Sequence, residues 1–184
     1  MPRLALRFLL CHRLPGKSGR SALGEIDLVG ATKQALRRLA TTVCVISSRH
    51  EGERFLMAAT AVEAMSMDPP SMLVCVNRSA SIHAPLAAGA DFAINVLSAD
   101  QEDISRLCGG GAKGEERFAC GDWRDGPGGL PLLGGAQANV VCKQDGLFAY
   151  GTHTIVIGRV ESVTVGDVVD PLLYVDGRYT RVPA

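Results

Sequence analysis

Aromatic residues and net charge are both scarce in this chain of 184 residues. Aromatic side chains make up 5% of the sequence, and 19 Lys and Arg residues are balanced by 19 Asp and Glu residues, so the formal net charge is zero. A chain without a basic surplus or stacking aromatics lacks the usual features of nucleic-acid-binding proteins. It also lacks a run of about 18 apolar residues, the length that a membrane-spanning helix needs. We therefore expect neither nucleic acid nor a membrane among its partners.

The cysteines form no pattern that indicates a disulfide framework or a metal site. The sequence has 6 of them, but no CxxC pair and no Cys/His spacing typical of zinc ligands. Cys44, Cys75 and Cys142 occur within apolar, strand-like runs, where cysteine behaves as a small hydrophobic residue. We expect reduced thiols in the core, a cytoplasmic location and no bound metal.

The first thirty residues differ in composition from the rest of the chain. Residues 1–20 contain several Arg and Lys residues and no Asp or Glu. Two interpretations are open, an organellar transit peptide or a poorly ordered tail, and we favour the tail. We predict a basic N-terminal extension over residues 1–30 and a single folded domain over residues 31–184.

The distribution of apolar residues predicts a mainly β domain with about three helices. Helical spacing favours a first helix over residues 31–40. Residues 109–135 are rich in Gly and Pro and predict a long loop, and the runs after it are broken by Gly or Asp-Gly, which indicates hairpins. Short β-rich runs predict strands over residues 41–48, 55–62, 71–77 and 91–98, and "SRHEGER" between the first two predicts a polar turn around Gly52. Because strands and helices do not alternate strictly, we expect an antiparallel barrel decorated by helices.

Polar residues follow the strand predicted over residues 71–77 and precede a predicted helix. Asn77, Arg78, Ser79 and Ser81 stand there as "NRSAS". Hydroxyls and an arginine at a helix start are typical of a phosphate site. The alternative is that Ser79 caps the helix and Arg78 is solvated. The sequence contains no P-loop and no GxGxxG motif that would supply another phosphate site.

Five segments of the sequence together resemble the flavin reductase family. They are "MAATAVEAMSMDPPSMLVCVNRSASIH", "FAINVLSADQEDIS", "ERF", "GTHTIVIGRVESV" and "PLLYVDGRY", in family order over residues 31–182. The resemblance implies a homodimeric, six-stranded antiparallel split barrel of the FMN-binding type. It also implies NAD(P)H:flavin oxidoreductase activity with FMN or FAD, with NADH or NADPH as hydride donor, and a flavin-dependent monooxygenase as the partner that receives reduced flavin.

The resemblance further implies roles for individual residues. His153 is expected beside the nicotinamide as the catalytic residue, where it contacts the dinucleotide or the flavin. The other residues are expected to bind the flavin or the dinucleotide. They are Thr60, Ala61 and Val62 along the isoalloxazine ring; Ser66 before the Asp-Pro-Pro turn; Asn77, Arg78, Ser79 and Ser81 at the ribityl chain and phosphate; Arg117 and Phe118 of "ERF"; and Tyr174 and Tyr179 near the C-terminus.

Two residues depart from the family pattern. Leu56 stands where the family often has Gly, and Glu63 stands where Thr or Ser is common. Glu63 would place a carboxylate near the flavin edge or point to solvent. These two departures leave open a non-catalytic dimeric binding module that has lost its flavin. Because a fold does not settle function, an electron carrier that holds FMN as a fixed group on the same barrel is also kept open.

Overall fold

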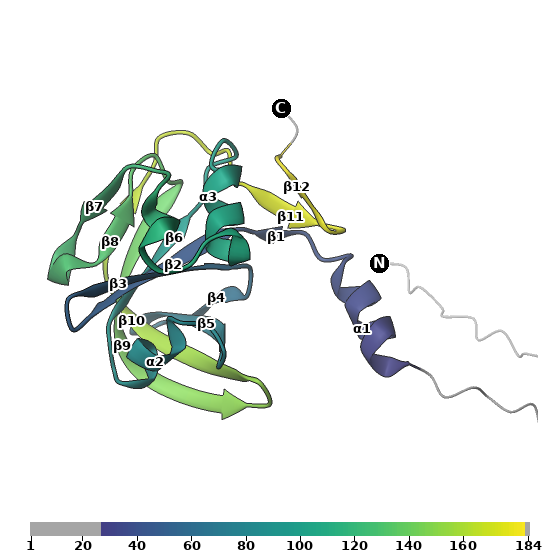
Figure 1. Ribbon diagram of the computed structural model, residues 1–184, viewed down its shortest axis with the longest axis horizontal. Coiled ribbons are helices and arrows are strands. Elements are labelled where there is room, and N and C mark those ends of the chain that lie inside the picture. Colours follow the sequence, from purple (N-terminus) through teal and green to yellow (C-terminus); the bar gives the residue numbers. More distant parts are fainter. Residues whose placement is uncertain (1–26, 183–184) are drawn as a thin grey trace, which may run out of the picture.

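One antiparallel sheet of seven strands forms the body of the protein in the computed structural model, which describes residues 27–182 (Figure 1). Its order is β3-β2-β6-β9-β10-β5-β4. The strands are β2 Cys44–His50, β3 Glu53–Ala59, β4 Val62–Met67, β5 Pro70–Asn77, β6 Phe92–Val96, β9 Ala138–Tyr150 and β10 His153–Val165. The expectation for residues 1–20 lies outside the described residues.

Short elements surround this sheet. The helices are α1 Leu28–Leu36, α2 His83–Ala87 and α3 Glu102–Arg106, followed by the π-helical turn η1 Leu107–Gly111 and the 3-10 turns η2 Gly114–Phe118 and η3 Pro127–Gly129. Two small sheets contain β1 Thr41–Thr42 with β11 Leu173–Val175 and β12 Arg178–Thr180, and β7 Trp123–Asp125 with β8 Pro131–Leu133. The domain is thus mainly β with helices, as predicted.

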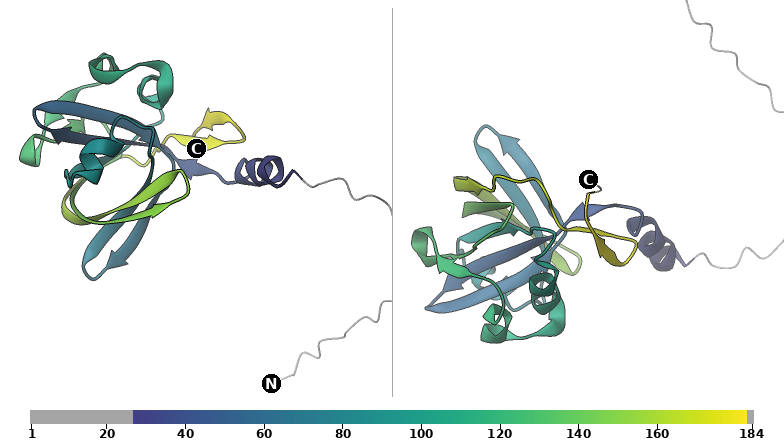
Figure 2. Two further views of the ribbon diagram at one scale, coloured as in Figure 1. Left: turned by 60° about the horizontal axis from the view of Figure 1, so that its bottom comes forward. Right: turned by 90° about the horizontal axis from the view of Figure 1, so that it is seen from above.

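The two outer strands of the main sheet are neighbours in the sequence. β3 ends at Ala59 and β4 begins at Val62, so Thr60 and Ala61 alone connect them. Two residues span less than about 11 Å even when extended, so the sheet must curve until its edges approach each other at this point. The hairpins β2–β3 and β4–β5 diverge from there (Figure 2). We call this connection the 60–61 link.

The predicted six-stranded barrel is wrong in its strand number. The sheet has seven strands, and in the described part of the chain no ladder joins β3 to β4. The difference arises where residues 55–62 were predicted as one strand. The chain leaves the sheet at Thr60 and Ala61 and re-enters it as the separate strand β4, which pairs with β5.

Strand β2 lies at the centre of the core because both of its faces are buried. Cys44 and Ile46 pack into one apolar cluster with residues of β5, α2 and β6. Val43 and Val45 pack into a second cluster under α3 and β8. Each fully buried aliphatic side chain contributes roughly 1.5–3 kcal/mol. The two clusters fix β2, and with it the hairpin that carries β3.

Two of the predicted hairpin turns are confirmed and one is wrong. Glu51 and Gly52 both have positive φ between β2 and β3, as do Asp176 and Gly177 between β11 and β12, which is the two-residue geometry that Gly favours. Asp145 instead lies inside β9, where the ladder to β10 shifts register and forms a bulge. Strand β10 pairs with β9 on both sides of this Asp-Gly pair, so β9 continues through it as a bulge.

The segment 109–135 is more ordered than the predicted long loop, because it contains η2, η3 and the β7–β8 hairpin. Its aromatic side chains pack against the core. Trp123 packs edge-on against Phe118, with 5.5 Å between ring centroids, and its indole N–H donates to the Cys120 carbonyl at 2.8 Å.

The first helix begins and ends earlier than predicted, at Leu28 and Leu36, and none of its residues is buried.

Within residues 27–182, no helix is both long enough and apolar enough to cross a membrane. The same residues bring together no group of three His, Cys, Asp or Glu side chains that could hold a metal ion.

Candidate functional site

The loop after β5, residues 77–81, is organised by Asn77. The Asn77 Oδ1 atom accepts hydrogen bonds from the Ser79 N–H and the Ser79 hydroxyl, both at 2.9 Å. Ser79 therefore does not cap α2, whose N-cap residue, Ile82, makes no side-chain hydrogen bond. The Arg78 side chain is exposed, and its backbone N–H donates to the Thr152 carbonyl at 3.0 Å. The loop has a fixed shape, and its Ser81 and Arg78 side chains are accessible.

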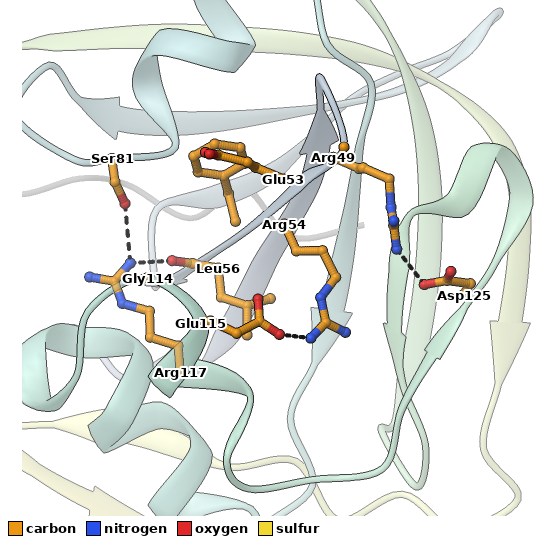
Figure 3. A pocket seen from close by; sticks show the side chains of 11 residues that line it. Arg49, Glu53, Arg54, Leu56, Ser81, Gly114, Glu115, Arg117 and Asp125 are labelled. Carbon is orange, nitrogen blue, oxygen red and sulfur yellow. Dashed lines mark hydrogen bonds and ion pairs between the residues drawn. The ribbon is translucent and has the colours of Figure 1, made fainter.

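Arg117 points from η2 toward this loop and carries an uncompensated charge. Its Nε–H donates to the Ala112 carbonyl at 3.0 Å, and Nη1 donates to the Leu56 carbonyl and lies 3.5 Å from the Ser81 hydroxyl (Figure 3). No carboxylate of residues 27–182 pairs with it. A half-buried guanidinium with neutral partners and a nearby hydroxyl is a site for an anion.

Beside Arg117 lies a pocket of about 640 Å³, which we call the arginine-lined pocket (Figure 3). This volume is within the range of about 300–1,000 Å³ typical of small-molecule sites. Among its lining residues are Arg49, Arg54, Phe55, Ser81, Arg117 and Asp125.

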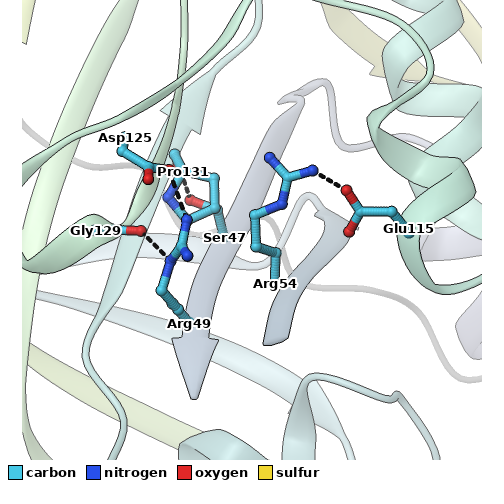
Figure 4. A network of polar contacts seen from close by, with 7 residues as sticks. All are labelled: Ser47, Arg49, Arg54, Glu115, Asp125, Gly129 and Pro131. Atoms are coloured by element: carbon cyan, nitrogen blue, oxygen red, sulfur yellow. Dashed lines mark hydrogen bonds and ion pairs between the residues drawn. The ribbon is translucent and has the colours of Figure 1, made fainter. Parts of the chain in front are cut away.

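Two ion pairs hold the walls of this pocket together. Arg49 on β2 lies opposite Arg54 on β3. Arg49 Nη2 lies 2.6 Å from Asp125 Oδ1, and its Nε–H donates to the Gly129 carbonyl at 2.5 Å. Arg54 pairs with Glu115 (Figure 4), and its guanidinium lies 4.0 Å from the Phe118 ring centroid. Phe118 is thus a packing support behind Arg54, and segment 109–135 is fastened to the β2–β3 hairpin.

A second hollow, of about 710 Å³, lies between α1, the β4–β5 hairpin and the β11–β12 hairpin. We call it the apolar cleft. Its lining includes Leu36, Leu39, Thr60, Ala61, Cys75 and Tyr174, and Glu63 lies at its wall. Glu63 is exposed, so its carboxylate remains hydrated. Leu56 is instead a core residue with 1% exposure.

The 60–61 link lines the apolar cleft, and Leu56 of the arginine-lined pocket lies four residues before it on β3. The Cys75 N–H donates to the Ala61 carbonyl at 3.0 Å, and Val62 pairs with Val74. These contacts place Thr60 and Ala61 beside the end of β5, next to Asn77. The structure therefore brings together the predicted residues of the link, of the 77–81 loop and of η2.

Ser66 is not part of this group. It lies at the far end of β4, where its hydroxyl accepts from the Asp68 N–H at 3.0 Å and where Ser66 is opposite Ser71 at the start of β5. Six residues of β5 separate this end from Asn77, about 20 Å along a strand. The position of Ser66 indicates a role in the turn.

His153 lies at the same end of the sheet as the 77–81 loop. It is opposite Asn77 in the β10–β5 ladder, and its ring is exposed. Its Nδ1 atom lies 2.9 Å from the Thr152 hydroxyl. The imidazole has no carboxylate partner among the described residues and is open to a ligand.

Tyr174 and Tyr179 form an edge-to-face pair on the β11–β12 hairpin, with ring centroids 5.1 Å apart. The Tyr179 hydroxyl lies 2.9 Å from the buried Ser105 hydroxyl, which anchors the hairpin to α3. Tyr174 is 37% exposed and reaches the apolar cleft. Tyr174 can contact a ligand there, and Tyr179 holds it in place.

Sequence reasoning missed the acidic and basic side chains that form the arginine-lined pocket. Arg49, Arg54, Glu115 and Asp125 belong to no motif, and the segment "SRHEGER" was interpreted as a polar turn. The charge alternation in that segment was the one available signal, and it does not reveal partners about 60 to 76 residues away along the chain.

Comparison with known proteins assigns the fold and the family. The family model described as "Flavin reductase like domain" matches residues 36–183. The NADH:FAD oxidoreductase SgcE6 of Streptomyces globisporus C-1027, solved with NAD and FAD fragments, superposes with a TM-score of 0.79 at 29% identity, covering 89% of this chain and 98% of that one.

Two sequence relatives carry functional names. The reductase component of FADH(2)-dependent resorcinol hydroxylase from a Rhizobium species is 38% identical over 149 residues, which is 80% of this chain and 83% of the relative. An FMN reductase (NADH), RutF, of Methylorubrum extorquens is 37% identical over 163 residues, 89% of this chain and 79% of the relative. The chain belongs to the flavin reductase-like family.

Proposed function

We propose that this protein is an NADH:flavin oxidoreductase that reduces a freely exchanging flavin and supplies it to a partner monooxygenase. The observation that carries the proposal is the arrangement around the 60–61 link. The link itself lines the apolar cleft, and Arg117, which has no carboxylate partner among the described residues, contacts Leu56 before the link and Ser81 of the 77–81 loop. This arrangement matches a ligand with an anionic end and a flat, largely apolar ring.

The residues present fit a flavin. Arg117, Ser81 and the loop around Asn77 would hold the phosphate and ribityl chain, with Arg78 and Ser79 at its edge. Thr60, Ala61 and Val62 have small or backbone-presenting surfaces, which allow a ring to lie against the link. The bound flavin supplies the hydride acceptor. The protein's contribution is to hold the two rings in contact, so catalysis depends on orientation.

His153 and Tyr174 would position the nicotinamide. Both are accessible, and both lie at the end of the sheet that contains the link. A neutral or charged imidazole can donate to the dinucleotide without taking part in proton chemistry, since hydride transfer itself needs no acid. We propose NADH over NADPH because the relatives carry the name FMN reductase (NADH) and the solved SgcE6 complex contains NAD.

The partner and assembly proposals follow from the relatives and from exposed apolar surface. The Rhizobium relative is named as the reductase component of a hydroxylase, which supports a flavin-dependent monooxygenase as the acceptor of reduced flavin. We also propose a homodimer, because α1 buries none of its residues and leaves Leu28 and Leu36 exposed beside the apolar cleft. Exposed apolar surface of this kind is typical of interfaces.

The proposed unit of function is residues 31–184, with residues 1–30 as an extension. We place the protein in the cytoplasm, since the five described cysteines are free thiols, as is usual in reducing compartments.

The second candidate is an electron carrier with fixed FMN on the same barrel. A measurement of catalytic turnover distinguishes it from the reductase. NADH oxidation would be followed at 340 nm in air while FMN is titrated. Turnover that saturates in FMN supports a reductase for which flavin is a substrate. No turnover by a yellow protein that keeps its flavin through gel filtration would contradict it and support the carrier.

A further inference from the structure

The arginine-lined pocket continues the proposed flavin site in one direction, along β3. The link is at one end of this strand, and Leu56, whose carbonyl accepts from Arg117, is four residues from Thr60. Arg54 follows two residues further on, an advance of about 7 Å along a strand. Arg49 lies opposite Arg54 on β2. Moving from Thr60 back toward Arg54 along β3 therefore increases the distance from the link, where the flavin ring is proposed to lie.

Arg117 and Ser81 belong both to the phosphate site and to the pocket wall. A flavin phosphate held there would sit at the mouth of the arginine-lined pocket. FMN ends at this phosphate. FAD continues through a second phosphate into adenosine, and the volume of about 640 Å³ beyond Arg117 is where that continuation would lie.

Arg54 is placed to contact the second phosphate. Its side chain is 29% exposed, and its guanidinium is held against Phe118 at 4.0 Å. Its present partner, Glu115, has a side chain that is 66% exposed and lies on the short turn η2. Releasing such a carboxylate to water costs little free energy, because exposed ion pairs contribute little to stability. A phosphate can therefore replace it on an arginine that is already oriented.

The remaining walls suit an adenosine. Phe55 is half-buried and lines the pocket, which offers an apolar surface to a flat base. Arg49 is occupied by Asp125 and the Gly129 carbonyl, so it keeps the far wall in place. One group opposes the anion: Glu53 is exposed, lines the pocket and forms no ion pair with the described residues.

We propose that the arginine-lined pocket is a subsite for the adenosine-phosphate half of FAD, in which Arg54 exchanges Glu115 for the second phosphate. The protein then prefers FAD to FMN as the flavin it reduces. This inference rests on the proposed function, because it assumes that the flavin phosphate is bound at Arg117 and Ser81.

The test compares FAD and FMN affinities by calorimetry in the full-length protein and three variants. Arg54→Gln should weaken FAD binding by about tenfold and change FMN binding by less than about twofold, since the lost contact is charge-assisted but partly solvated. Glu115→Gln frees Arg54 and should tighten FAD binding about threefold. Arg124→Gln removes an arginine from the exposed pair with Asp122, outside the pocket, and should leave both affinities unchanged.

Opposite signs for the two pocket variants are the decisive result. If the pair only fastens η2 to β3, both substitutions loosen the same contact, and both flavins are affected in the same direction. That outcome, or an unchanged FAD-to-FMN ratio in Arg54→Gln, overturns the subsite. Arg54→Lys retains the charge and should recover most of the FAD affinity.

Failure of the proposed function gives a different signature. A wild-type protein that binds flavins but oxidises no NADH would end the reductase assignment, whereas the affinity ratio still decides the subsite. A protein that oxidises NADH with both flavins and shows no effect of Arg54→Gln would retain the reductase assignment and lose the subsite.

Discussion

The arginine-lined pocket lies along β3 and the apolar cleft lies at the 60–61 link after β3 ends, and their walls are held in different ways. Two ion pairs within the chain, Arg49–Asp125 and Arg54–Glu115, span the walls of the first. The second is bounded by a helix without a single buried residue and by a terminal hairpin, joined by the Arg37–Asp176 pair at 3.9 Å. The walls of the arginine-lined pocket are thus formed and joined by residues of a single chain. The second offers its apolar surface to something else, a ring or another protomer.

The largest expected effect comes from removing the buried amide that joins β2, β6 and β8. Asn95 is fully buried, accepts from the Leu133 N–H at 2.9 Å and donates to the Val45 carbonyl and the Ser47 hydroxyl, both at 3.0 Å. Asn95→Ala should lower the free energy of unfolding by about 3 kcal/mol, since it leaves buried groups unpaired. Denaturant unfolding measures this.

The control for Asn95 is Ser47→Ala, which removes one hydroxyl from the same network and should cost less, about 1 kcal/mol. A loss in Asn95→Ala no greater than that in Ser47→Ala would mean that the amide does not join the three strands.

The next effect separates the two arginines near the flavin phosphate. Arg117→Gln should raise the dissociation constants of FMN and FAD alike by about ten- to a hundredfold, because a charge-assisted hydrogen bond contributes about 1.5–3 kcal/mol. Arg78→Gln should have a smaller effect, about threefold, because its side chain is exposed and more strongly screened. Quenching of flavin fluorescence measures both, and a larger effect at Arg78 would reverse the assignment.

A chemical probe addresses the apolar cleft alone. Cys75 is half-buried and lines the cleft, whereas burial raises the pKa values of Cys44, Cys108 and Cys142 to about 12. A raised thiol pKa means that the reactive thiolate is almost absent at pH 8 and appears as the pH approaches 12.

We therefore expect N-ethylmaleimide at pH 8 to slow NADH oxidation severalfold through Cys75. The measurement uses protein carrying Cys11→Ser and Cys120→Ser, with and without Cys75→Ala. Inhibition that persists after Cys75→Ala would show that the cleft is not the sensitive site.

The smallest effect compares matched glycines, one in each hollow. Gly52 and Gly177 have φ of 83° and 79°, so Ala at either position is strained by about 1 kcal/mol. A Cβ on Gly52 meets nothing within 4 Å, whereas one on Gly177 would lie 2.6 Å from Arg37 Nη2. Gly52→Ala should cost that strain alone, and Gly177→Ala should also displace the Arg37 side chain. Equal losses of unfolding free energy would show that Arg37 moves freely.

Local patterns predicted much of the fold and the position of the 77–81 loop. The β-rich runs of β2 and β5, the turns at Gly52 and Gly177, and the cluster of hydroxyls after Asn77 are each decided by a few adjacent residues. The strand β4 was missed because, after Val62, its residues "EAMSM" include no β-branched or aromatic side chain.

The arginine-lined pocket was beyond sequence reasoning. Its pairs join β2 and β3 to a segment 61 and 76 residues away, and partner choice at such separations depends on the packed fold. The bulge at Asp145 shows the same limit, because neighbouring strands overrode a strong turn signal.

In mechanical terms a two-residue connection such as the 60–61 link can serve as a hinge, with the hairpins β2–β3 and β4–β5 as its two arms (Figure 2). Any opening of the gap between them displaces atoms in proportion to their distance from the hinge. The flavin ring would lie at the pivot, whereas Arg54 lies six residues out along its arm, about 20 Å away. An opening that barely disturbs contact between the rings would therefore move Arg54 by much more. The same chain can keep its hydride-transfer geometry precise while the outer end of the site admits and releases nucleotide.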